Sequence, residues 1–147
     1  MSDLLHAPGP DGRTIEVLDG GDPEGFAVLY HGGSPSAVAA YQPMDDTARE
    51  LGLRLVTYSR PGYGASTPRP AAGTYADDVT ESTVVLDHLG IDDFLTFGWS
   101  GGGPRALASV PVRGPARRRG LGRRSRAVSV GPGSRWLPRL AALPARG

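Results

Sequence analysis

The spacing of apolar residues in the first part of the chain predicts alternating strands and helices. Residues 14–18 alternate between apolar and polar after the turn Asp11-Gly12, which indicates a hairpin strand. Short apolar runs are typical of buried parallel strands, and helical spacing that ends at a glycine marks the helices. Thr74 is a suitable capping residue for the second helix. Strands are expected at 14–18, 26–30, 53–58 and 93–97, and helices at 38–51 and 75–89, before a short helical start that ends at Ala108.

This alternation predicts an α/β fold with a mostly parallel sheet and right-handed crossovers. Sites in such sheets form in the loops at the carboxyl ends of the strands. His31, Arg60 and Ser100 each lie just after a predicted strand. We therefore expect them along one edge of the sheet, which is the first indication of an active site.

Composition restricts the kinds of protein and site that are possible. The 147 residues suffice for one ordinary domain. The absence of cysteine excludes a disulfide scaffold, a thiolate zinc site and a cysteine nucleophile. No apolar run reaches about 18 residues, and residues 1–10 lack the features of a secretory signal. We expect a cytoplasmic protein without a membrane span, a cofactor or a bound metal, and its oligomeric state is left open.

Charge divides the chain into two parts. All 15 acidic residues lie at or before Asp93, and every basic residue is an arginine. Residues 1–108 hold six arginines and a net charge of −9, whereas residues 109–147 hold ten arginines, no acidic residue and a net charge of +10. Prolines interrupt any helical pattern in the second part. We expect a partial α/β domain at 1–108 and a disordered, Arg/Pro/Gly/Ala-rich tail at 109–147.

Two explanations of this basic tail remain open. The first explanation is a frameshift or a similar truncation after about residue 108. The regular apolar pattern ends there, at the same point as the net charge changes sign. The residues that dominate the tail, Arg, Gly, Pro and Ala, also have GC-rich codons. Alternatively, the clusters at 117–119 and 123–124 contact nucleic acid or an anionic membrane surface. Charge runs are usually only solvated, so nucleic-acid binding is the less favoured function.

The most specific chemical motif is Gly98-Trp99-Ser100-Gly101-Gly102. It fits G-x-S-x-G between a predicted strand and a helical start, where glycines permit the sharp turn that exposes a serine hydroxyl. Ser100 is the candidate nucleophile, and the Gly101 N–H is a candidate oxyanion donor. The alternative is a Gly-rich turn that Ser100 merely caps. A dinucleotide fingerprint is disfavoured by the glycine spacing, and a phosphate loop by the absence of lysine.

A second motif, His31-Gly32-Gly33-Ser34-Pro35, follows an early strand. Its glycines can point a backbone N–H into a cleft, and Gly33 is the candidate second oxyanion donor. We expect His31 and Gly32 to shape this loop rather than to act as a base. The alternative is an ordinary Gly-Pro turn.

Together with the loop at 60–66, these motifs make residues 12–108 resemble the N-terminal half of an α/β-hydrolase. The likeness is greatest to small bacterial hydrolases related to proline iminopeptidases and esterases. It implies an incomplete three-layer, doubly wound sheet, and hydrolysis of a small ester or amide through Ser100. Epoxide hydrolases and dehalogenases of this fold carry aspartate as nucleophile, so Ser100 argues against them.

The resemblance also implies what this chain lacks. The family order is Ser, then acid, then His, but no Asp, Glu or His follows Ser100. The three histidines, His6, His31 and His88, lie upstream. A serine without a base is a weak nucleophile, so we expect the chain to be nearly inactive. Half a sheet with uncovered strand faces also predicts poor stability.

Overall fold

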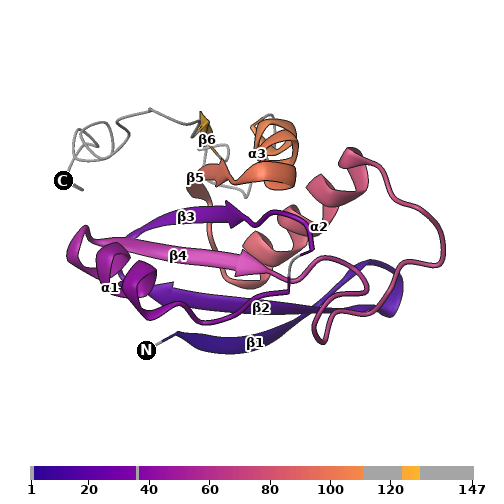
Figure 1. Cartoon of the computed structure of the whole chain (residues 1–147), viewed down its shortest axis with the longest axis horizontal. Coiled ribbons are helices and arrows are strands. Elements are labelled where there is room, and N and C mark those ends of the chain that lie inside the picture. The colour runs from indigo at the N-terminus through magenta and orange to yellow at the C-terminus, as the bar shows by residue number, and fades with distance from the viewer. Residues whose placement is uncertain (1, 36, 111–123, 130–147) are drawn as a thin grey trace.

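The computed structural model describes residues 2–35, 37–110 and 124–129, and builds one six-stranded sheet in the order β1-β2-β4-β3-β5-β6. The strands are β1 (Asp3–Pro8), β2 (Thr14–Gly21), β3 (Phe26–His31), β4 (Leu53–Tyr58), β5 (Asp93–Gly98) and β6 (Arg124–Ser129). β2 pairs antiparallel with β1 and with β4, whereas β4, β3, β5 and β6 are parallel to one another (Figure 1). The predicted strands at 26–30 and 93–97 therefore lie side by side in one sheet.

Helices cover both faces of this sheet, which gives the predicted three-layer α/β arrangement. The helices are α1 (Gln42–Glu50), α2 (Tyr75–His88) and α3 (Gly103–Ser109), with short 3-10 turns η1 (Pro10–Gly12) and η2 (Ser100–Gly102). On one face, Ala48 of α1 packs with Val28 and Leu95. Side chains alternate along a strand, so the next residue in β3 points to the opposite face, where α2 packs.

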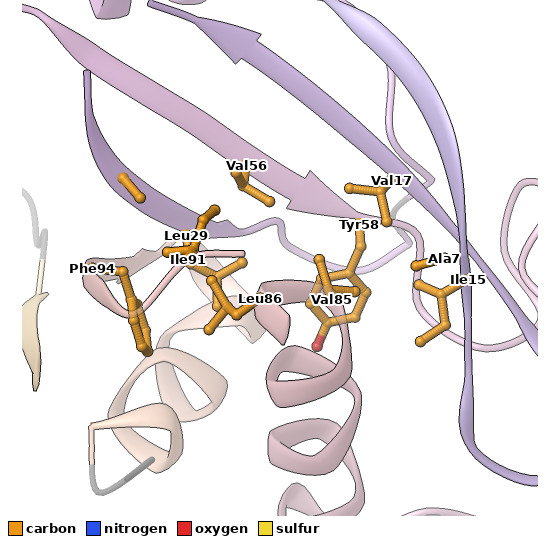
Figure 2. Close-up of a cluster of buried hydrophobic side chains, with 11 residues drawn as sticks. Ala7, Ile15, Val17, Leu29, Val56, Tyr58, Val85, Leu86, Ile91 and Phe94 are labelled. Carbon is orange, nitrogen blue, oxygen red and sulfur yellow. The ribbon is translucent and has the colours of Figure 1, made fainter. Parts of the chain in front are cut away.

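The larger hydrophobic cluster lies between the sheet and α2. Leu29, Leu86 and Phe94 are almost fully buried there (Figure 2). Burying a side chain of this size contributes about 1.5–3 kcal/mol. This cluster fixes β3 and β5 beside each other, and these two strands carry the candidate site at their carboxyl ends.

Local chemistry explains the helix boundaries. Thr74 and Asp77 form a reciprocal capping box at the start of α2, so the predicted cap and helix are present. The first helix begins at Gln42 rather than at residue 38. Pro43 lacks an N–H and is tolerated only in the first helical turn, so it determines this start.

The amino-terminal strands extend further than the sequence analysis predicted. β1 was not expected, and it pairs with β2 through the turn at η1, where Asp11 has a φ of 58°. β2 continues beyond the predicted strand at 14–18 and ends at Gly21. Pairing of β2 with β4 up to Gly21 and Arg54 stabilises this extension.

Within the predicted basic tail, the structure describes residues 124–129. They form β6, whose backbone pairs in parallel with β5, because the edge of β5 presents N–H and C=O groups that a further strand can use. The rest of the predicted tail, at 111–123 and 130–147, lies outside the described residues. The division into a domain at 1–108 and a tail at 109–147 stays a prediction.

Candidate active site

Ser100 lies on a tight turn between β5 and α3, where the G-x-S-x-G motif predicted it. β5 ends at Gly98, Trp99 is still extended, and Ser100 opens the 3-10 turn η2. Ser100 has a φ of 53°, in the left-handed region that L-residues rarely adopt. Such a conformation costs of the order of 1–3 kcal/mol, so the surrounding structure must enforce it. The side chain is exposed.

The glycines on either side of Ser100 allow the chain to pack closely. A Cβ on Gly98 would collide with the Gly102 backbone, and a Cβ on Gly102 would collide with the carbonyl oxygen of His31. Backbone hydrogen bonds hold this packing, since Trp99 N donates to His31 O at 3.0 Å and Gly102 N donates to Trp99 O at 2.9 Å. The turn is therefore fixed against the end of β3.

The loop after β3 lies beside Ser100. A Cβ on Gly33 would be 3.3 Å from Ser100 Cβ, and a Cβ on Gly101 would be 3.1 Å from Ser34 Oγ. The structure thus brings together Gly33, Ser100 and Gly101, the three residues that the two motifs predicted for a nucleophile and its oxyanion donors. Gly101 belongs to the first helical turn, whose N–H groups lack intrahelical acceptors.

His31 is buried beneath this loop. Its side chain is 4% exposed, its Nε2 lies 3.5 Å from Ser109 Oγ, and its ring meets Tyr58 edge to face. Burial lowers the pKa of His31 to about 4; the Asp78 charge opposes this effect, and the Arg105 and Arg60 charges add to it. His31 is therefore neutral at pH 7.

The loop after β4 is tied to both neighbouring strands. Arg60 Nη2 donates to Gly33 O at 2.7 Å and to Ser34 Oγ at 2.9 Å. Below it, Ser59 Oγ donates to the buried Glu16 carboxylate at 2.6 Å, and the same carboxylate accepts the Ala65 N–H. Arg60 therefore reaches the candidate oxyanion loop directly.

Two residues beside the turn were missed by the sequence analysis. Arg105 of α3 donates to Gly101 O at 2.5 Å, and its Nε lies 2.7 Å from Asp78 Oδ2 of α2. Their pairing depends on how α2 packs against α3, and no local pattern in the sequence signals it.

An acid–base pair for Ser100 is not found in the part of the chain that the structure describes. None of its His, Asp or Glu side chains forms a hydrogen bond with the Ser100 hydroxyl, and none occurs after Ser100 in the sequence. The described residues therefore combine the candidate nucleophile Ser100 with two candidate oxyanion donors, and none of them provides a proton acceptor bound to the serine hydroxyl.

Comparison with known proteins agrees with this geometry. The sequence profile of the family described as alpha/beta hydrolase fold matches residues 27–112. The chain belongs to this alpha/beta hydrolase family. The match runs from the second residue of β3 through β4, β5 and both motifs, so the candidate site lies within the region that the family shares. No curated protein matches the sequence significantly.

Several solved structures resemble this chain. An epoxide hydrolase from an endophytic Streptomyces is 25% identical with a TM-score of 0.65, and the alignment covers 74% of this chain and 33% of that one. A proline iminopeptidase-related protein from Thermus thermophilus is 22% identical with a TM-score of 0.60, with 74% and 40% covered. An epoxide hydrolase from Vigna radiata is 18% identical with a TM-score of 0.65, with 74% and 34% covered. The chain thus spans between a third and two fifths of these structures.

None of the helices in residues 2–35 and 37–110 is both long enough and apolar enough to cross a membrane.

Proposed function

We propose that this alpha/beta hydrolase chain carries the nucleophile half of a serine hydrolase site that acts on esters or amides. The observation that carries the proposal is the placement of Ser100. Its φ of 53° and its exposed side chain present the hydroxyl at the carboxyl end of β5, with Gly33 alongside. A tight turn of this kind is typical of an activated serine rather than of a simple helix cap.

In the proposed reaction, Ser100 Oγ attacks the carbonyl carbon of the substrate, the π electrons of the C=O bond move onto its oxygen, and the hydroxyl proton passes to water, which gives a tetrahedral intermediate. Its collapse breaks the bond to the leaving alcohol or amine, which takes a proton from water, and a second water then hydrolyses the acyl-serine ester. The N–H groups of Gly33 and Gly101 would donate to the negative oxygen that develops. Arg105 supports this arrangement indirectly, because it holds the Gly101 carbonyl and thereby the peptide groups of the turn. His31 takes no proton in this scheme, since it is buried and contacts Ser109.

Catalysis by the 147-residue chain is expected to be residual. Serine hydrolases that lose their His or acid keep only the contribution of the oxyanion hole and substrate binding. We expect ester turnover roughly 10⁴-fold or more below that of an enzyme with a complete triad.

Epoxide hydrolases among the similar structures raise epoxide opening as a second candidate reaction. Epoxide hydrolases of this fold use a carboxylate nucleophile. Ser100 supplies an alcohol instead, so we favour acyl transfer.

A fluorophosphonate probe tests the proposal. The folded chain should be labelled slowly on Ser100, and the Ser100→Ala variant should not be labelled. Ser2→Ala removes a hydroxyl remote from the turn, where it binds Asp45, and should be labelled like the parent chain. Labelling that survives in Ser100→Ala, or that is equally fast in the urea-unfolded chain, would contradict the proposed role of Ser100.

A further inference from the structure

Arg60 is a cation that is largely withdrawn from water at the edge of the candidate site. It follows β4 closely, and its residue is 9% exposed. Its Nη2 atom donates two hydrogen bonds, to the Gly33 carbonyl at 2.7 Å and to the Ser34 hydroxyl at 2.9 Å. The guanidinium also lies over the Tyr63 ring, with its Cζ 5.5 Å from the ring centroid. The two acceptors and the ring carry no net charge, so none of them neutralises the guanidinium.

The other arginines in residues 2–35 and 37–110 are all paired with carboxylates. Their ion pairs are Arg13–Glu81, Arg49–Asp45, Arg54–Asp19, Arg69–Asp78 and Arg105–Asp78. Arg60 has no such partner among the described residues, because no carboxylate oxygen lies within 4.0 Å of it. All 15 acidic residues of the chain are among the described residues, so the tail adds no acidic side chain that could pair with it.

A guanidinium that is mostly buried and has no carboxylate partner lowers the stability of the folded chain, unless an anion binds to it. Burial, followed by the nearby Arg105 charge, lowers the pKa of Arg60, and Tyr63 and Asp78 only partly oppose this shift. The Nε and Nη1 atoms of Arg60 form no hydrogen bond with described residues. They are also not among the fully buried polar atoms that lack a hydrogen-bond partner, so both keep some contact with solvent. The guanidinium therefore keeps two donor atoms that can still be reached from outside.

These donors suit a carboxylate, because a guanidinium presents N–H groups that match the two oxygens of a carboxylate. The position also fits the reaction. Ser34 Oγ contacts Arg60 on one side and faces Gly101 on the other, and Gly33 lies between Arg60 and Ser100. Because Arg60 and Ser100 both adjoin Gly33, a substrate that binds both would have to carry its carboxylate close to the carbonyl at Ser100.

We infer that Arg60 binds a carboxylate group of the ligand, so that the ester or amide taken by this site carries a negative charge near its acyl carbon. This substrate class rests on the proposed function of Ser100. The binding of a carboxylate by Arg60 does not, so the two can be tested separately.

The experiment measures binding of benzoate and of benzamide to the full chain by saturation-transfer NMR. The two probes have nearly the same shape and differ in charge. We expect saturable benzoate binding at least tenfold tighter than benzamide binding. Arg60→Met should abolish this preference, whereas Arg54→Met, which removes an arginine already paired with Asp19, should keep it. Ser100→Ala should also keep it, because the nucleophile takes no part in binding the carboxylate.

Circular dichroism and urea unfolding show whether each variant is folded. Arg60→Lys serves as a second variant, since it keeps the charge but loses the paired donors, and should weaken benzoate binding at least threefold. A preference for benzoate that persists in both Arg60 variants would assign it to the arginine-rich tail and overturn the inference. Equal binding of benzoate and benzamide by the parent chain would overturn it as well. Neither result would affect probe labelling of Ser100.

Discussion

Replacing Gly102 by alanine should destabilise the protein, whereas replacing the adjacent Gly103 should stabilise it. A Cβ on Gly102 would collide with the His31 carbonyl oxygen and lie 2.7 Å from Gly32 O. Both obstacles are backbone atoms, which cannot move away by rotating a side chain. Overpacking of this kind costs about 3 kcal/mol, at the upper end of the usual range. Alanine recovers about 0.5–1 kcal/mol of backbone entropy, so a net loss of roughly 2 kcal/mol is expected.

Gly103 is the matched control because it lies next in the chain without these neighbours. Its φ and ψ of −57° and −53° are helical, and no atom outside its chain neighbours and its own helix backbone lies within 4 Å of a Cβ built there. Alanine should therefore raise the free energy of unfolding by about 0.5–1 kcal/mol.

Urea unfolding followed by far-ultraviolet circular dichroism measures both changes. Thermal unfolding gives a second measurement, because for a chain of this length 1 kcal/mol corresponds to roughly 3 °C in Tm. The Gly102 variant should have a lower Tm than the parent chain and the Gly103 variant a higher one, so that the two differ by several degrees. If Gly102→Ala were as stable as Gly103→Ala, the close packing of the turn against β3 would be refuted.

Two further predictions concern buried polar groups near the site. His31 has a folded-state pKa of about 4 against 6.5 in the unfolded chain, so the unfolded state binds the extra proton first as pH falls. The free energy of unfolding should drop by about 2 kcal/mol between pH 7 and pH 5, and a folded His31→Gln variant should lose most of that dependence. Glu16→Ala should cost about 1–3 kcal/mol, because Ser59 Oγ and Ala65 N both donate to that carboxylate. Glu16→Gln keeps an acceptor oxygen and should lose less than half as much in urea unfolding; an equal loss would show that the charge itself matters.

The sequence predicted the parts of the site that depend on local chemistry. Glycines that follow an apolar strand identified the turn at Ser100, and the order of strands and helices placed Gly33 at the same sheet edge. Thr74 predicted the start of α2 for the same reason, since a capping side chain bonds within its own first helical turn.

Contacts between segments that are far apart in the chain could not be predicted from the local sequence. The ion pair between Arg105 and Asp78 forms only after α2 and α3 pack together. The lack of a carboxylate partner at Arg60 is equally a property of the whole fold. β1 was missed because its pairing with β2 is what makes it a strand.

The hydrogen bond from Trp99 N to His31 O has a consequence for hydrogen exchange. It joins the turn at Ser100 to a strand that enters the sheet much earlier in the chain, with β4 and α2 formed in between. The turn is held by β3 and is too short to persist by itself. Any partial unfolding that separates β3 from β5 therefore also unfolds the turn at Ser100. The amide hydrogens of Trp99 and Gly102 should then exchange with solvent at the same rate as those at the centre of β3. If the loop moved locally instead, these two amide hydrogens would exchange at different rates. A common rate would show that the candidate site unfolds together with the sheet as one cooperative unit.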